Sequence, residues 1–281
     1  MSDSTVTIGL TRSGRKKPGP LPYSDLDPAN WREYSDLELG SLWMFASRAR
    51  GNGHANEYHG NYIPQIATQT LRRYTKPGDV VLDLFLGSGT TAIEASRLGR
   101  KCVGVEIKRE LAAEVRAKFE DASDVQVVHG DSRSARAQNS VSAALSRWGK
   151  EEAQMLMLHP PYHDIIKFSD IDGDLSNAAT LDDFMMDFTQ VARRGYKLLE
   201  SGRFAVLVIG DKYAAKELVP LGFFCMQAMM EVGFRLKSIV VKNMAGNEIG
   251  KGPRENLWRY RALRGGFYIF KHEYVMVLQK P

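Results

Sequence analysis

The stretch "DVVLDLFLGSGTT" (79–91) decides the fold. Its first half is a short apolar run, which is typical of a buried strand. Gly87 and Gly89 then permit a tight turn, because glycine adopts positive φ without steric cost, and Thr90 and Thr91 open a segment with helical spacing. A strand, a glycine-rich turn and a helix in this order predict the first unit of an α/β domain with a ligand site at the turn.

The same alternation of strand and helix continues to the end of the chain. Strand patterns follow at 101–107, 124–130, 153–159, 203–211, 235–243 and 267–279, and helical patterns at 108–122, 134–149, 181–199 and 222–233. Together with 79–85 these strands predict an α/β fold with a mostly parallel, seven-stranded sheet and helices on both faces. We expect the last two strands to enclose a basic loop over 244–266.

Composition excludes several classes of protein. The chain has 281 residues, of which 43% are hydrophobic and 25% charged, the ordinary balance of a globular protein. Apolar runs stay short of the roughly 18 residues of a membrane span, and no secretory pattern opens the sequence, so we expect a cytoplasmic protein without a membrane partner. Cys102 and Cys225 lie far apart, and His54 and His59 have no cysteine nearby, so no metal site is expected.

Positive charge is concentrated in two segments. The net charge is +5, and residues 11–20 and 251–266 carry basic side chains with little acid. The first segment indicates a disordered arm, either a solubilising tail or a nucleic-acid contact. We expect it to belong to an N-terminal extension, residues 1–57, preceding a catalytic domain of residues 58–281. The second segment mixes guanidinium and aromatic groups, which suits phosphate contact and base stacking, and its candidate nucleic-acid residues are Arg254, Trp258, Arg259, Arg261 and Arg264.

Acidic side chains stand at successive strand ends. Glu106, after the second strand, can accept hydrogen bonds from both hydroxyls of a ribose. Asp131, after the third strand, can bond the exocyclic amine of an adenine, and Asp83 ends the first strand. The glycine-rich turn lacks the third glycine of a dinucleotide site and the lysine of a phosphate-binding loop, which disfavours nicotinamide and nucleoside triphosphates.

The fourth strand ends in "HPPY" (159–162). Proline has no N–H and a fixed φ, so Pro160 and Pro161 stop the strand ladder and stiffen the backbone. The residue before a proline is held extended, which aims His159 into the cleft. The Pro160 carbonyl can accept one N–H of an exocyclic amine, the side chain at 159 can accept the other, and Tyr162 offers a flat face for stacking.

In this order "VLDLFLGSGTT", "GVEI", "HGDSR" and "HPPY" resemble the S-adenosylmethionine-dependent amino-methyltransferases of DNA. These enzymes methylate N6 of adenine or N4 of cytosine. The likeness continues in residues 58–83, which are similar to the segment that closes over the methionine part of the cofactor, and it reaches the last strand. The resemblance therefore implies a Rossmann-like methyltransferase fold over 58–281, with S-adenosyl-L-methionine as cofactor.

Site residues follow from the matched motifs. Candidate cofactor contacts are Pro64, Asp83, Phe85, Gly87, Ser88, Gly89, Thr90, Thr91, Glu106, Ile107, Asp131 and Ser132. Candidate catalytic residues are His159, Pro160, Pro161 and Tyr162, with His163 as a substrate contact because it follows the tyrosine.

One residue departs from the family pattern. The first residue of the tetrapeptide is usually Asp, Asn or Ser, whereas this chain has His159; a neutral imidazole keeps one acceptor nitrogen. The function predicted is methyl transfer to a DNA base after base flipping. An RNA amino-methyltransferase and a catalytically silent nucleic-acid-binding subunit remain alternatives. A homodimer or a partner subunit also stays open.

Overall fold

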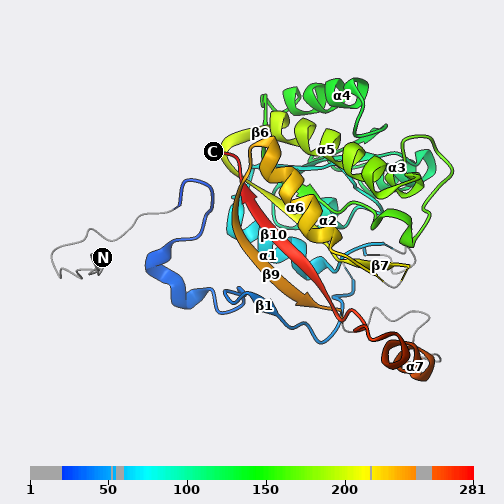
Figure 1. The fold of residues 1–281 in the computed structure, drawn as a ribbon. Helices are drawn as coiled ribbons and strands as arrows, with labels where there is room; N and C mark the ends of the chain where they lie inside the picture. The colour runs from blue at the N-terminus through cyan, green and yellow to red at the C-terminus, as the bar shows by residue number, and fades with distance from the viewer. Residues whose placement is uncertain (1–20, 52, 55–59, 216, 245–254) are drawn as a thin grey trace, which may run out of the picture.

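A computed structural model describes residues 21–51, 53, 54, 60–215, 217–244 and 255–281, without the side chains of 255–258. Its centre is an eight-stranded sheet, and a two-stranded hairpin lies apart from it. The basic arm predicted at 11–20 lies outside the described residues. Figure 1 shows the sheet enclosed between two layers of helices.

The strands of the sheet are β1 Leu42–Trp43, β2 Val80–Asp83, β3 Lys101–Glu106, β4 Val125–His129, β5 Ala153–Leu158, β6 Leu199–Ile209, β9 Arg235–Asn243 and β10 His272–Gln279. The hairpin pairs β7 Lys212–Ala214 with β8 Glu217–Val219. The α-helices are α1 Pro64–Tyr74, α2 Thr90–Arg97, α3 Arg109–Lys118, α4 Ala135–Ser146, α5 Leu181–Leu198, α6 Leu221–Val232 and α7 Glu255–Gly265. Short 3-10 helices are η1 Pro28–Glu33, η2 His163–Ile165 and η3 Leu175–Asn177.

The strand order is β1-β9-β10-β6-β5-β2-β3-β4. Neighbouring strands pair in parallel except at β10, which is antiparallel to both β6 and β9. The predicted α/β, mostly parallel sheet is confirmed, but the predicted count of seven strands is wrong. The eighth is β1, whose two residues pair with β9 through Leu42↔Val241 and Trp43↔Lys242; a strand this short leaves no periodic signal in the sequence.

Alternating residues of the central strands pack into two separate hydrophobic cores, one on each face of the sheet. In β5, Leu156 and Leu158 face the core shared with α4, α5 and α6, whereas Met155 and Met157 face the core shared with α1, α2 and α3. Both faces are apolar because both are covered, as in other parallel sheets. Figure 1 shows α5 and α6 on one side of the strands and α1 on the other.

One connection differs from expectation. The segment 244–266 was expected to be a loop, but residues Glu255–Gly265 form the helix α7. Among the side chains of α7 that the structure describes, the apolar Tyr260 is 56% and Leu263 82% exposed, so these two belong to no buried apolar stripe of the kind that makes a helix readable from sequence. In Figure 1 α7 stands away from the sheet, beyond the ends of β9 and β10.

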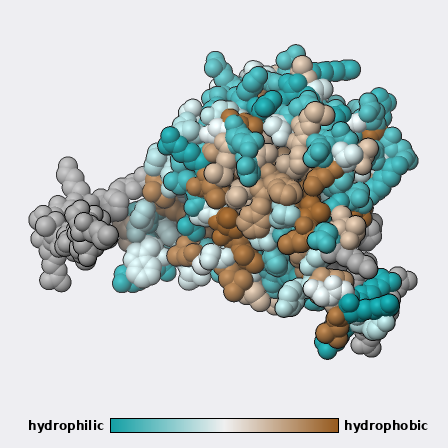
Figure 2. Space-filling view, viewed as in Figure 1, coloured by the Kyte–Doolittle hydropathy of each residue, from teal (hydrophilic) through white to brown (hydrophobic). Residues whose placement is uncertain are grey.

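One face of the molecule carries an apolar strip. Figure 2 shows apolar side chains gathered over α6, where Phe223 and Phe224 are each 40% and Met230 is 44% exposed. Exposed apolar patches are frequent at protein interfaces, so this strip is the first surface at which to test the homodimer, which stays a prediction. Among the described helices, none combines the length and the apolar character needed to cross a bilayer.

The N-terminal residues pack on the α/β core. Ser24 donates through its hydroxyl to the Arg72 carbonyl of α1, and the Phe45 amide donates to the side chain of Asn243 at the end of β9. The described part of the extension therefore wraps the sheet edge and α1. The domain boundary at residue 57 stays a prediction.

Candidate functional site

The cavity lies at the carboxyl end of the parallel strands. The strand order reverses between β2 and β5. The chain continues from β2 to β3 and β4 on one side of this pair, and from β5 to β6 on the other side. Such a switch point opens a crevice in which α/β sheets bind ligands. A cavity with about 1040 Å³ of open space, solvent at its mouth included, occupies this place. It is lined by the end of β3, by residues that follow β2, β3, β4 and β5, and by the segment before α1.

The glycine-rich turn after β2 forms the cavity floor. Gly89 has φ 91° and precedes α2, a conformation that a side chain would strain. Leu86 is buried in the turn and packs onto Gly104 of β3, where an added Cβ would lie 2.4 Å from the Leu86 Cδ1. Glycine in the second strand therefore lets the turn settle on the sheet, and Phe85 and Gly87 face the cavity.

Asp83 holds the turn from below. The carboxylate is 2% exposed; its Oδ1 accepts from the Phe85 amide at 2.9 Å and its Oδ2 from the Thr91 hydroxyl. Thr91 also bonds the Tyr62 hydroxyl. Burial raises the pKa of Asp83, and these hydrogen bonds oppose that rise. The predicted cofactor contact is thus placed under the turn, where it joins β2, α2 and the segment before α1.

Glu106 stands at the cavity wall with both oxygens oriented. Its Oε2 accepts from the Gly87 amide and its Oε1 from the Lys108 amide, each at 2.9 Å. Each carboxylate oxygen still has a lone pair for a ligand. Burial raises the pKa of Glu106 to about 7, although the two backbone bonds lower it. This arrangement fits the two hydroxyls of a ribose.

Asp131 also lines the cavity, after β4. Arg133 donates to both of its oxygens, with Nη2–Oδ2 at 3.0 Å and Nε–Oδ1 at 3.2 Å, and pairs with Asp187 of α5 at 2.6 Å. The carboxylate is therefore held by an arginine bridged to the helix layer. Its contact with an adenine amine stays a prediction.

His159 follows β5 where the ladder stops. The β5–β6 pairing ends at Leu158↔Leu207, and Pro160 has no N–H to continue it. In place of a ladder hydrogen bond, His159 Nδ1 lies 2.9 Å from the Val208 carbonyl oxygen. The other ring nitrogen, Nε2, lies 2.9 Å from the Gly60 carbonyl oxygen. A neutral ring donates to only one of these carbonyls. His159 thus lies between β6 and the segment before α1, with one ring nitrogen near each carbonyl, rather than standing with a free acceptor.

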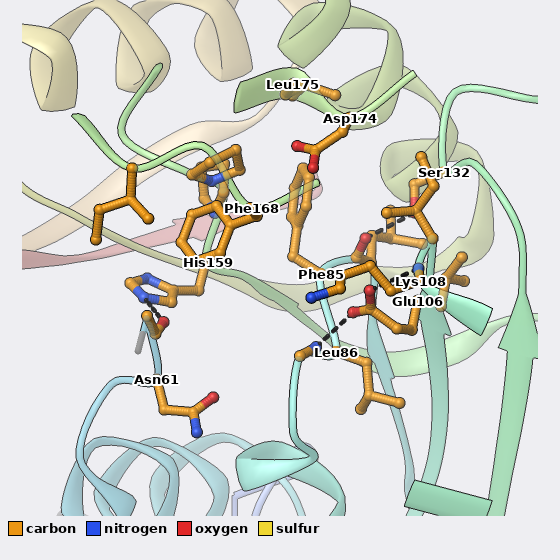
Figure 3. A pocket seen from close by; sticks show the side chains of 18 of the residues that line it. Asn61, Phe85, Leu86, Glu106, Lys108, Ser132, His159, Phe168, Asp174 and Leu175 are labelled. Atoms are coloured by element: carbon orange, nitrogen blue, oxygen red, sulfur yellow. Dashed lines mark hydrogen bonds between the residues drawn. The ribbon is translucent and has the colours of Figure 1, made fainter. Parts of the chain in front are cut away.

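Tyr162 completes this wall. Its hydroxyl donates to Glu273 Oε2 at 3.2 Å, its ring lies edge-on to His159 with centroids 5.8 Å apart, and Gly210 packs against it. Burial, and next the charge of Glu273, raise the pKa of Tyr162 well above the usual value. Figure 3 shows the His159 wall and the Glu106 wall on opposite sides of one cavity.

The structure brings most of the predicted site residues to this cavity. Those that line it are Phe85, Gly87, Thr90, Glu106, Ile107, Asp131, Ser132, His159, Pro160, Pro161 and Tyr162. Pro64, Asp83, Ser88, Gly89 and Thr91 lie behind it, within the turn and the adjoining helices.

Other predicted residues lie elsewhere. His163 is 5% exposed, with Nδ1 2.8 Å from Lys212 Nζ and Nε2 3.0 Å from the Ala178 carbonyl. It therefore lies below the surface, and its contact with a substrate stays a prediction. Among the basic residues, Arg259, Arg261 and Arg264 are exposed on α7, Arg254 lies outside the described residues, and the Trp258 side chain is not described. His54, in the segment before α1, bonds Glu94 of α2 at 2.8 Å, and His59 is outside the described residues.

Several lining residues were not predicted. Asn61 and Tyr62 form a wall beside His159 and are tied to the turn through Ser88 and Thr91. The quoted likeness of residues 58–83 was the signal that could have found them. Phe168, Asp174 and Leu175 come from the connection between β5 and α5, where the sequence has no periodic pattern and no motif.

Two family models match the chain. The DNA methylase model of the N6/N4 type matches residues 12–117, and a model described as conserved hypothetical protein 95 matches residues 67–186. The first includes the glycine-rich turn and Glu106. The predicted resemblance to the S-adenosylmethionine-dependent DNA amino-methyltransferases is confirmed. The DNA methylase match ends before the tetrapeptide, so it does not test the residues of that wall.

Curated relatives point to the same family. The Type II methyltransferase M2.DpnII of Streptococcus pneumoniae is 46% identical over 120 residues, which are 42% of this chain and 42% of that protein. The Type II methyltransferase M.MjaII of Methanocaldococcus jannaschii is 33% identical over 73 residues, 25% of this chain and 14% of that protein. The matches thus span less than half the length of these relatives.

Solved structures confirm the fold. A geranyl diphosphate methyltransferase, solved in complex with S-adenosylmethionine, aligns with a TM-score of 0.50 at 12% identity, over 78% of this chain and 84% of that one. At this identity the likeness concerns the Rossmann-like fold alone, because one fold hosts many substrates.

Proposed function

We propose that this chain transfers a methyl group from S-adenosylmethionine to the exocyclic amine of a DNA base, N4 of cytosine or N6 of adenine. The observation that carries this proposal is one cavity with two walls of different chemistry. One wall presents an oriented carboxylate, Glu106, and the other presents the tetrapeptide His159, Pro160, Pro161 and Tyr162.

The residues on the first wall fit the cofactor. Glu106 accepts hydrogen bonds from the ribose hydroxyls, and Phe85 and Ile107 supply apolar contact for the adenine. The glycine-rich turn has no side chain at Gly87, so its backbone can approach the cofactor closely. When bound there, S-adenosylmethionine supplies an electrophilic methyl group that a nitrogen takes by in-line displacement. The protein contributes chiefly by holding both reactants in line.

The residues on the second wall orient the target amine. The Pro160 carbonyl accepts one N–H, and the Tyr162 ring stacks on the base, which leaves the duplex by flipping. Nδ1–H of His159 donates to the Val208 carbonyl, so Nε2 carries a lone pair. This nitrogen accepts the second N–H once the Gly60 carbonyl, now 2.9 Å away, has moved aside. Two accepted protons direct the nitrogen lone pair at the methyl group, and the surplus proton leaves to water.

Helix α7 is the proposed DNA contact beside the cavity. Because β9 runs parallel to β6, its carboxyl end and the connection bearing α7 lie at the same edge of the sheet as the site. Arg259, Arg261 and Arg264 are exposed on this helix with Tyr260 among them. Exposed guanidinium groups neutralise backbone phosphates without reading sequence.

Methyl transfer from labelled S-adenosylmethionine tests the function. Unmethylated duplex DNA and total RNA are offered separately, and the nucleosides are resolved by mass spectrometry. We expect label in DNA as N4-methylcytosine or N6-methyladenine, which also decides the target base. Label in RNA alone supports the RNA alternative, and cofactor binding without transfer to either supports the silent subunit.

Binding of S-adenosylhomocysteine, the demethylated product, should depend on pH through Glu106. The pKa of this carboxyl is raised to about 7, and the ionised form is the one that accepts two hydroxyls. Affinity should therefore rise about tenfold between pH 6 and pH 8, with protons released on binding near pH 7. Calorimetry in buffers of different ionisation enthalpy measures both. Glu106→Gln should bind more weakly, with the pH dependence removed; a pH dependence retained in this variant would assign it to another group.

The salt dependence of the affinity for duplex DNA should show whether α7 contacts the DNA. Arg259→Ala should reduce the slope of log affinity against log salt by about one unit, since one phosphate contact is lost. Arg147→Ala, at the carboxyl end of α4, is the matched control and should leave the slope unchanged. Equal slopes in the parent and in Arg259→Ala would place the DNA elsewhere.

A further inference from the structure

A buried ion pair lies behind the tetrapeptide. Lys242 of β9 and Glu273 of β10 are directly opposite in the strand register, 1% and 4% exposed, with Nζ–Oε1 at 2.9 Å. Removing two charges from water costs about as much as their attraction returns, so such a pair adds little net stability. Its position suggests another use.

The second oxygen of Glu273 points to the active wall. Oε2 accepts from the Tyr162 hydroxyl, while Oε1 is held by Lys242. The raised pKa of Tyr162 keeps this phenol protonated, so it donates. A carboxylate fixed by an ammonium group on one side is a rigid acceptor on the other.

The Tyr162 ring is thus held at three places. Glu273 binds its hydroxyl, His159 meets it edge-on, and Gly210 packs so close that an added Cβ would lie 3.0 Å from the ring. Tyr162 also lines the cavity. Its ring angle therefore depends on β9 and β10, although none of the described residues that line the cavity belongs to these two strands.

We propose that Lys242 and Glu273 are positioning residues, which set the angle at which the Tyr162 ring stacks on the target base. This rests on the proposed function, because it assumes that Tyr162 stacks on a base. Neither residue touches the reacting atoms. Glu273 acts through the tyrosine hydroxyl, and Lys242 acts through Glu273.

A double-mutant cycle tests this chain of contacts. Glu273→Gln preserves shape but leaves one acceptor oxygen for two donors. The single-turnover rate should fall about tenfold, as misplaced reactants do, with affinity for S-adenosylhomocysteine unchanged. Tyr162→Phe should cause a similar loss, and the double variant should lose no more than either single one. Additive losses would overturn the proposal, because Glu273 would then act independently of the hydroxyl.

A second readout needs no activity. 3-Fluorotyrosine placed at position 162 reports the ring environment by fluorine NMR of the ligand-free protein. Glu273→Gln should shift or broaden this resonance. Asp79→Asn is the matched control, since Asp79 and Arg203 form another buried pair, 3.2 Å apart, near the amino end of β2, and it should leave the resonance unchanged. An unshifted resonance in Glu273→Gln contradicts the proposal.

The two readouts separate this proposal from the function it rests on. If the parent transfers no methyl group to DNA, the proposed function fails, and the fluorine signal still decides whether Glu273 sets the ring. If transfer occurs and neither the signal nor the cycle shows coupling, the function stands and the positioning role fails.

Discussion

His159→Ala should slow single-turnover methyl transfer by about 100-fold, the loss seen when one oriented hydrogen-bond group is removed from a transition state. The variant loses the acceptor for the amine and also the bridge between Val208 and Gly60. Affinity for S-adenosylhomocysteine should remain, because Glu106 and the turn lie on the opposite wall. Rapid-quench transfer and calorimetry on the same preparation measure the two quantities.

His159→Asn is the matched variant. An asparagine is usual at this position in the family that the chain resembles, and its amide oxygen can accept an amine N–H without bridging to Gly60. It should regain most of the rate. Transfer in His159→Ala as fast as in the parent would make the imidazole a bystander, with the Pro160 carbonyl as the working acceptor.

Asp83→Ala should lower the free energy of unfolding by about 2–6 kcal/mol. The substitution leaves the Phe85 amide and the Thr91 hydroxyl without their buried acceptor, and each such loss costs about 1–3 kcal/mol. Because these two bonds hold the turn, binding of S-adenosylhomocysteine should fall as well. Urea unfolding and calorimetry measure the two effects.

Asp83→Asn provides the contrast for that prediction. Its amide oxygen can still accept from Phe85, and its NH₂ can donate to Thr91 if the bond between Thr91 and Tyr62 reverses. Most of the stability should return. Equal destabilisation by Ala and Asn would mean that the charge of Asp83, rather than its hydrogen bonds, holds the turn.

The strand and helix pattern was readable where periodicity is strong. The run 153–159 is apolar on both faces because both faces of the sheet are covered, and it became β5. Periodicity failed for β1, which has two residues, and for α7, whose described apolar side chains Tyr260 and Leu263 are exposed. The edge of the sheet and the exposed helix therefore had to come from the structure.

The candidate site could be predicted from the sequence where its residues follow directly from a strand pattern. Glu106 ends β3 and the tetrapeptide directly follows β5, so the strand pattern alone predicted their positions at the carboxyl edge of the sheet. Long-range partners were not readable: Gly60 lies 99 residues from His159, and Glu273 lies 111 residues from Tyr162. A free acceptor at His159 was a reasonable expectation from "HPPY" alone, and only the tertiary fold reveals the two carbonyls that its ring meets.

The pairing of β1 with β9 has a consequence for synthesis on the ribosome. Phe45, just after β1, bonds Asn243, which lies 198 residues later in the chain. At about 5–20 residues per second, roughly 10–40 s separate the emergence of these two segments. During that interval Trp43, 4% exposed in the finished fold, has no β9 to pair with. The β1 edge therefore cannot close before β9 is synthesised, and a ribosome stalled before β9 would hold a nascent chain in which Trp43 lacks its partner strand.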